Sequence, residues 1–150
     1  MAVIQATYGQ PGVYNATPPT LTDGQAGAFQ FDVHGNVKTT TSTVTAASNA
    51  SSTAYEASHV IKASSGTLYR LTGYNSKASA QFIQLHDAAS LPADTAVPVL
   101  IFSVPATSNF SLDFGDSGMN FTTGIVVCDS STGPTKTIGA ADCFFSAQYV

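Results

Sequence analysis

The chain has 150 residues, and a hydrophobic content of 43%, with 9 Phe and 6 Tyr, is enough for the core of one domain. Only 9% of the residues are charged, compared with about 25% in typical soluble proteins, whereas 36 residues are Ser or Thr. Five Lys and Arg residues are too few for a phosphate-binding stripe, so we expect no nucleic acid partner. The sequence contains no run of about 18 apolar residues and no signal peptide pattern, so we expect no membrane partner.

The beginning of the chain, residues 1–38, predicts an extended arm that carries a short hairpin. Three prolines in its first half exclude a helix of any length. Phe29, Phe31 and Val33 alternate with polar residues, which predicts a half-buried strand, and a turn after it would return the chain over residues 37–39. Because a lone two-stranded hairpin is only marginally stable in water, we expect this arm to need a partner surface.

The rest of the chain predicts a linker and then a domain made of strands. Residues 39–54 are rich in Ser, Thr and Ala, and with Val44 as their only bulky apolar side chain they predict a linker. Residues 55–150 contain strand-like runs separated by turn sequences, without an amphipathic helix. The predicted strands are 55–63, 67–75, 81–87, 97–104, 110–114, 122–128 and 143–150. The sequence therefore predicts an all-β chain in which an antiparallel β-sandwich or jelly roll follows the arm.

The motifs that could carry chemistry are weak. The segment from Gly115 to Gly118 resembles the nucleophile segment of trypsin-like serine proteases, but Met119 and Asn120 depart from that pattern and a β-turn is favoured. A loose calcium-loop pattern, formed by Asp113, Asp116 and Asn120, lacks the ordered ligand spacing of such loops, so we expect turn positions for these residues. The histidines are scattered, and we expect surface or turn positions for all three: His34, His59 and His86. We therefore expect a protein that is not an enzyme, with no catalytic residues, no cofactor and no metal.

The two cysteines leave two alternatives open. Cys128 and Cys143 both lie at the ends of predicted strands. Without a secretion signal, free thiols are favoured. If the two strands pair as a hairpin, however, the cysteines could face each other and form a disulfide.

Seven aromatic residues of the predicted sandwich also allow two interpretations. They could line a sugar-binding face, but such faces usually present Trp, which this chain lacks, so core packing is favoured. These residues are Tyr69, Tyr74, Phe82, Phe110, Phe121, Phe144 and Tyr149.

Two stretches of the chain resemble structural proteins of tailed-bacteriophage virions. Residues 19–37 match a pattern of Leu-x-Asp-Gly-Gln-x-Gly followed by a short alternating strand and Asp-x-x-Gly. Residues 59–150 are similar to the β-sandwich module of such proteins, with Gln81-Phe-Ile-Gln-Leu-His-Asp-Ala88 among the matching segments. The resemblance implies a virion component without catalytic activity, most specifically a capsid decoration (cement) protein on the outer capsid surface, made in the cytoplasm of the bacterial host.

The expected partners are the major capsid protein and further copies of the chain, with a trimer favoured because icosahedral shells offer three-fold sites. The arm would contact the shell or a neighbouring subunit through Leu21, Asp23, Gln25, Phe29, Phe31 and Val33. Two alternatives stay open: a tail, neck or adaptor protein, and a carbohydrate-binding module for host attachment.

Overall fold

The computed structural model describes a few residues near the start of the chain and all residues from 47 onward. The described residues are 13–14, 30–31, 34, 36–37 and 47–150. The chain divides into two compact units, residues 1–43 and residues 44–150. Within the described part, no helix is long and apolar enough to cross a membrane.

The first unit contains a small parallel β-pair. β1 (Val13–Tyr14) pairs with β2 (Gln30–Phe31). β2 lies within the strand predicted for residues 29–33, but its described partner is β1, which precedes it along the chain. Of the predicted return strand over residues 37–39, only Val37 is described, as an isolated bridge residue. The other two residues of that strand lie outside the described residues.

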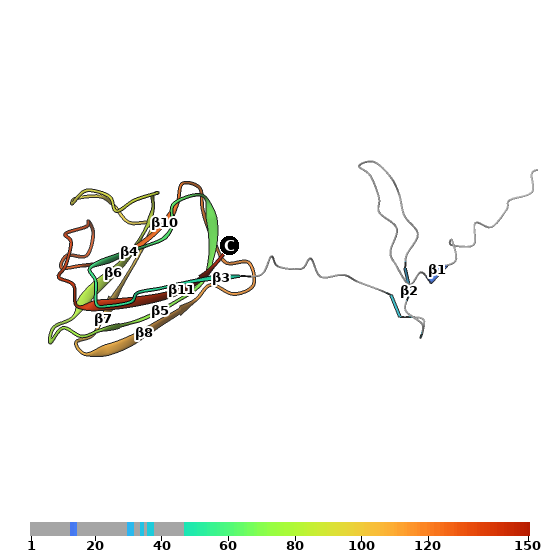
Figure 1. Ribbon diagram of the computed structural model, residues 1–150, viewed down its shortest axis with the longest axis horizontal. Helices are drawn as coiled ribbons and strands as arrows, with labels where there is room; N and C mark the ends of the chain where they lie inside the picture. Colours follow the sequence, from blue (N-terminus) through green and yellow to red (C-terminus); the bar gives the residue numbers. More distant parts are fainter. Residues whose placement is uncertain (1–12, 15–29, 32–33, 35, 38–46) are drawn as a thin grey trace, which may run out of the picture. The chain divides into compact units, whose positions relative to one another are not determined.

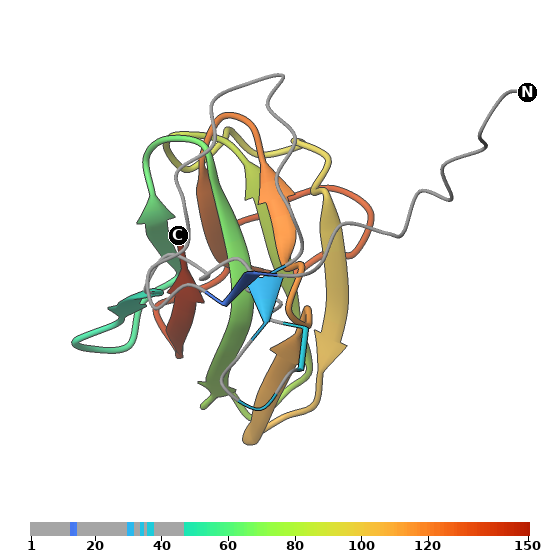
Figure 2. The ribbon, with the colours of Figure 1, turned by 90° about the vertical axis from the view of Figure 1, so that its right-hand side faces the viewer.

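The second unit is a sandwich of two antiparallel sheets (Figure 1). One sheet has four strands in the order β4 (Ser58–Lys62), β10 (Ile125–Ser130), β6 (Gln81–Asp87) and β7 (Leu100–Val104). The other has five, in the order β3 (Ser48–Ser51), β11 (Cys143–Tyr149), β5 (Gly66–Asn75) and β8 (Ser108–Asp113), with β9 (Met119–Phe121) paired to the start of β5. Figure 2 shows that the long strands run in nearly the same direction, as in aligned sandwiches. The predicted fold class, an all-β antiparallel sandwich, is confirmed.

The hydrophobic core lies between the two sheets because alternate side chains of each strand point inward. Ile83 and Leu85 of β6 pack in one cluster with Ile125 and Val127 of β10 and with Phe145 of β11. All five side chains are buried. Burying a side chain of this size contributes roughly 1.5–3 kcal/mol relative to leaving it exposed, so this cluster holds the two sheets together.

A β-bulge at Tyr69 explains why the leucines of β5 do not follow a strict two-residue period. Consecutive residues of β11 lie opposite Arg70 and Leu68, so the pairing skips Tyr69. The extra residue reverses the side to which the following side chains point. Leu68 and Leu71 are therefore both fully buried in the core, although they are three residues apart.

The outer face of the four-stranded sheet is covered by the loop over residues 131–142. All six residues of its central strand β10 are buried, on both faces of the sheet. The side-chain amide of Gln84 donates from this face to the carbonyl oxygen of Gly133 in the loop, at 2.9 Å. His86, on the same face, is only 2% exposed. Our expectation of a surface or turn position for His86 is wrong, because the loop covers the face on which it lies.

The predicted linker over residues 39–54 is wrong in its second half. Residues 48–51 form β3, which pairs with residues 146–149 of β11 at the edge of the five-stranded sheet. This strand contributes main-chain hydrogen bonds and carries only small or polar side chains, so no hydrophobic period marks it in the sequence. Residues 39–46 lie outside the described residues.

Candidate functional site

The outer face of the five-stranded sheet carries a group of three aromatic side chains, Tyr55, Tyr74 and Phe144, which we call the aromatic patch. The ring of Phe144 lies 5.9 Å, centroid to centroid, from the ring of Tyr55 and also 5.9 Å from that of Tyr74. Tyr55 is 50% exposed and Phe144 is 39% exposed. Large aromatic side chains that stay this exposed are suited to contact a partner or a sugar ring through their faces.

The local structure explains why the three rings meet. Phe144 of β11 and Tyr74 of β5 are register partners in adjacent strands and point to the same face. The chain that follows β3 continues along β11, because the N–H of Ser52 donates to the carbonyl of Phe145 at 2.8 Å. The N–H of Glu56 then donates to the carbonyl of Cys143 at 2.7 Å, which holds Tyr55 beside Phe144.

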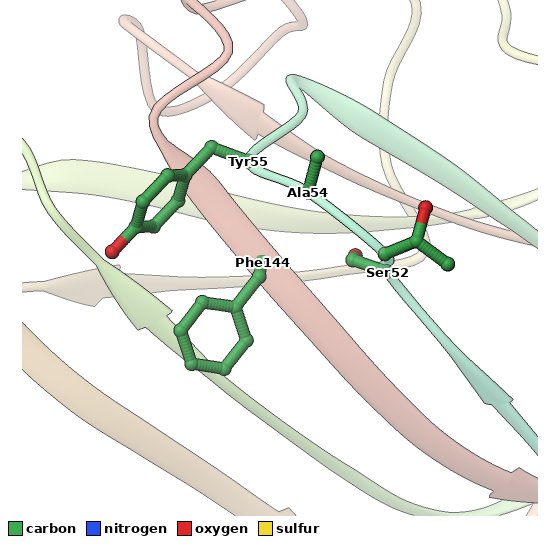
Figure 3. A pocket seen from close by; sticks show the side chains of 5 residues that line it. Ser52, Ala54, Tyr55 and Phe144 are labelled. Carbon is green, nitrogen blue, oxygen red and sulfur yellow. The ribbon is translucent and has the colours of Figure 1, made fainter.

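A shallow pocket opens between the aromatic patch and the segment that follows β3 (Figure 3). It is lined by Ser52, Thr53, Ala54, Tyr55 and Phe144. Figure 3 shows the rings of Tyr55 and Phe144 side by side, with Tyr55 on the loop and Phe144 on the strand. The lining of the pocket therefore combines two aromatic rings with the hydroxyl-bearing residues Ser52 and Thr53.

The same sheet face becomes polar away from the aromatic patch. The hydroxyl groups of Ser51 and Ser146 lie 2.8 Å apart, in a hydrogen bond between β3 and β11. Farther along the face, Arg70 Nη2 donates to Asp113 Oδ2 at 2.7 Å, and both side chains are more than half exposed. The N–H of Gly115 and the Arg70 guanidinium hold the pKa of Asp113 below its usual range. Along the outer face of the five-stranded sheet, the aromatic patch is thus followed by hydroxyl groups and then by charged groups.

A second group of polar side chains lies inside the sandwich, between the two sheets. Asp129 of β10, Asp142, and Cys143 of β11 each place a carboxylate oxygen or sulfur within 4.8 Å of the other two. Asp129 and Cys143 are fully buried, and Asp142 is partly buried. Within the described residues, this is the group of His, Cys, Asp and Glu side chains that could hold a metal ion. We call it the inter-sheet cluster.

The inter-sheet cluster is electrostatically unusual because its groups have little access to water. Burial, followed by the neighbouring Asp142, raises the pKa of Asp129 to about 8. Burial, followed by Asp129 and Asp142, raises the pKa of Cys143 to about 12. Gln81 donates from Nε2 to Asp142 Oδ1 at 2.5 Å and to Asn75 Oδ1 at 2.9 Å, but neither oxygen of Asp129 has a hydrogen-bond partner.

The residues predicted to contact the shell lie in the first unit. Leu21, Asp23, Gln25, Phe29 and Val33 are outside the described residues. Phe31 lies in β2. Their predicted role as contacts remains a prediction.

Of the two alternatives for the cysteines, the structure has the favoured one, free thiols, and not the disulfide. Cys128 and Cys143 are both buried free thiols. Cys128 belongs to β10 of the four-stranded sheet and Cys143 to β11 of the other sheet, so the two strands do not pair as a hairpin.

The other predicted motifs are dispersed over the sandwich. Residues 115–117 form a turn between β8 and β9, closed by the N–H of Gly118 donating to the carbonyl of Gly115 at 3.1 Å, as we expected of the protease-like segment. Asn120 accepts a hydrogen bond from Thr67 at 2.7 Å, whereas Asp113 pairs with Arg70, so these residues do not form a calcium loop.

The seven aromatic residues expected in the core differ in burial. Four of them are only partly buried: Tyr69, Tyr74, Phe82 and Tyr149. Phe110 and Phe121 are buried, in agreement with the prediction. Phe144 is exposed in the aromatic patch, so core packing is the wrong interpretation for it. Sequence reasoning found Phe144 and Tyr74 among the possible surface aromatics but missed Tyr55, whose position depends on β3.

Comparisons of this chain with protein-family models, with curated proteins and with solved structures gave no match.

Proposed function

We propose that this chain is a structural protein of a tailed-bacteriophage virion, acting as a decoration protein that binds the major capsid protein on the outer shell. The proposal rests on the resemblance of residues 19–37 and 59–150 to such proteins, and on the division of the chain. The decoration protein would act without catalysis and as a homo-oligomer, with a trimer favoured.

The observation that carries the proposal is the division of the chain into two units. The described strands from β3 to β11 find their sheet partners among themselves, so the sandwich forms its core from the second unit. In this proposal the first unit, residues 1–43, attaches the sandwich to another surface. Attachment through an extended segment and a compact domain together raises the overall affinity through effective concentration.

The surface composition of the sandwich also supports a role in assembly. Few of its residues are charged, and its five-stranded sheet presents hydroxyl groups such as those of Ser51 and Ser146. When such a surface packs against another protein, its desolvation costs less free energy than the desolvation of a charged surface would. The resulting attachment would also depend little on salt concentration.

Quantitative mass spectrometry of purified particles of the source virus tests this proposal. We expect hundreds of copies of the chain per particle, counted against the major capsid protein. A few to a few dozen copies would favour the tail, neck or adaptor alternative, and absence of the chain from the particle would overturn the virion proposal.

A truncated chain tests the role of the first unit. We expect the chain without residues 1–43 to remain folded, but to bind particles that lack the protein roughly 100-fold more weakly than the full chain does. Circular dichroism and thermal unfolding give the control for folding. Binding equal to that of the full chain would refute attachment through the first unit.

A second candidate function, carbohydrate binding for host attachment, is favoured by the aromatic patch. Tyr55 and Phe144 present exposed rings beside the hydroxyl groups of Ser52 and Thr53, an arrangement suited to a sugar ring. Binding to a glycan array by the wild-type chain, lost in Phe144→Ser but kept in Phe102→Leu on the other sheet, would support this function. No binding by the wild-type chain would exclude it for the glycans tested.

A further inference from the structure

The inter-sheet cluster holds a buried carboxylate, Asp129, whose pKa is raised by burial and by the nearby Asp142 carboxyl and lowered by the Gln81 amide, but whose oxygens form no hydrogen bond. Asp129 is fully buried, and both of its carboxylate oxygens lack a hydrogen-bond partner. An unpaired buried carboxylate is costly, and structures retain one where it binds a proton, an ion or a ligand. Its neighbours Asp142 and Cys143 offer an oxygen and a sulfur within 4.8 Å.

The types of donor atom in the cluster select a particular class of metal ion. Two carboxylates and one thiol combine hard and soft ligands. Calcium and magnesium ions prefer oxygen ligands throughout, whereas zinc commonly binds both Cys sulfur and Asp oxygen. The donor set therefore favours a zinc-like divalent transition metal.

The spacing of one pair of donor atoms is close to what such an ion needs, and all three donors lie within 4.8 Å of one another. Cys143 Sγ and Asp142 Oδ1 are 4.0 Å apart. Zinc bonds of about 2.0–2.3 Å at a tetrahedral angle separate sulfur and oxygen ligands by roughly 3.5 Å. A contraction of about half an ångström would bring these two ligands into range, and rotation of the Gln81 side chain would release Asp142 Oδ1 from its hydrogen bond.

The charges of the cluster also favour a divalent ion. Asp129, Asp142 and a Cys143 thiolate together carry three negative charges, and Lys77 Nζ lies 3.8 Å from Asp142 Oδ2. The lysine supplies one positive charge and a divalent ion supplies two, so the occupied cluster is neutral. A neutral cluster removes the main cost of burying charged groups between the sheets.

We propose that Asp129, Asp142 and Cys143 supply three of the four ligands of a zinc-like divalent metal ion that links the two sheets of the sandwich. Asp129 comes from the four-stranded sheet, and Cys143 from the five-stranded sheet, so the ion crosslinks β10 to β11. Its role is structural, since the ion lies between the sheets and stabilises the folded domain by binding it in preference to the unfolded chain.

The purified full chain, freed of metal with a chelator, is titrated with Co²⁺ and Zn²⁺ to test the proposal. We expect one Co²⁺ per chain, with the thiolate-to-cobalt absorption band that Cys ligation produces, and a rise in Tm on addition of Zn²⁺. The band should be lost in Cys143→Ser and kept in Cys128→Ser, which removes the other buried cysteine and leaves the cluster intact.

If the Cys143→Ser variant fails to fold, the Asp129→Asn variant tests metal binding in its place. This variant retains the size of the side chain and should show no rise in Tm with Zn²⁺. If the wild-type chain shows no cobalt band and no change in Tm with Zn²⁺, the proposal is overturned, and a proton shared between Asp129 and Asp142 takes the place of the ion. In that case Asp129→Asn should raise the Tm of the chain without metal.

Discussion

Lys136 and Asp94 form an ion pair in which the two charges have very different exposure. Lys136 is 2% exposed, whereas the side chain of Asp94 is 51% exposed. The pair joins the loop over residues 131–142 to the segment between β6 and β7, where the N–H of Lys136 also donates to the carbonyl of Ala96 at 2.8 Å. The Lys136 ammonium, followed by the N–H of Ile138, holds the pKa of Asp94 below its usual range. The buried ammonium therefore depends on one carboxylate at the surface.

Because Lys136 depends on Asp94, removing only the carboxylate should lower the stability more than removing both charges. Asp94→Asn should lower the Tm, because it leaves the Lys136 ammonium buried without its counter-charge. Lys136→Met in the Asp94→Asn background should restore the Tm, since an apolar side chain of similar length replaces the unpaired charge. Thermal unfolding of the single and double variants measures the coupling.

The exposed Arg70–Asp113 pair supplies the matched control. Both side chains are more than half exposed, so water screens the interaction. Asp113→Asn should leave the Tm unchanged. An equal loss of Tm in Asp94→Asn and Asp113→Asn would contradict the importance of burial.

Because His86 is buried, we expect the stability of the protein to depend on pH. Burial, followed by the positive charge of Lys136, lowers the pKa of His86 below its ordinary value of 6.5, and its Nε2 has no hydrogen-bond partner. The unfolded chain takes up a proton near pH 6.5, whereas the folded chain takes it up only at a lower pH, so the free energy of unfolding falls as the pH drops below about 6.5. The loss is about 1.4 kcal/mol for each pH unit between the two pKa values.

His86→Leu isolates this contribution from those of other groups. The difference in free energy of unfolding between the wild-type chain and the variant should change between pH 7 and pH 5, with the wild-type chain losing more. Denaturant titrations at several pH values measure it. Parallel curves for the two chains would show that His86 does not titrate differently in the folded and unfolded states.

The strands that could be predicted from the sequence are those whose own side chains build the core. The sequence predicts a strand at the bounds of β6, Gln81–Asp87, because a short strand-like run with apolar residues lies there between turn sequences. The runs at 67–75 and 143–150 were likewise predicted to within one residue of β5 and β11. The bulge at Tyr69 was not predictable, since it depends on the register with β11.

The candidate sites were harder to predict, because tertiary contacts assemble them. β3 has no hydrophobic period and exists through its pairing with β11, so the position of Tyr55 could not be foreseen. Asp129 and Asp142 are 13 residues apart on either side of a long loop, and only the packing of the two sheets brings them together. No local motif marks either site.

The structure leaves no space for even one methyl group at Gly73. Gly73 lies near the end of β5, opposite Phe110 of β8 and Phe145 of β11. A Cβ atom there would overlap the carbonyl oxygen of Phe144 and the ring of Phe110. Gly73→Ala should therefore cost roughly 1–3 kcal/mol or more of the free energy of unfolding, measured by denaturant titration.

Gly133→Ala is the control for this substitution. Its nearest atoms are ring carbons of Phe82 at 3.5–3.8 Å, which is ordinary contact distance. The free energy of unfolding should change little in this variant. A Gly73→Ala chain as stable as the Gly133→Ala chain would show that the strands can separate locally without cost.

Two truncations, which begin the chain at residue 47 or at residue 53, separate the predicted linker from the strand found within it. The first keeps β3 and should unfold at the same Tm as the second unit of the full chain. The second removes β3 together with Ser52, whose N–H donates to Phe145 O at 2.8 Å and whose hydroxyl accepts from Phe145 N–H at 2.8 Å. Each hydrogen bond lost contributes about 0.5–1.5 kcal/mol, so the shorter chain should be less stable by a few kcal/mol.

The shorter chain should also expose the edge of β11. Unpaired main-chain groups at a sheet edge invite pairing with another chain, so we expect this variant to self-associate, measured by light scattering. Hydrogen exchange should show loss of protection, in the shorter chain alone, at those amides of residues 144–149 that face β3 and not β5. Equal stability, exchange and association of the two truncations would mean that β3 adds nothing to the sheet, and that residues 48–51 behave as the linker their composition predicts.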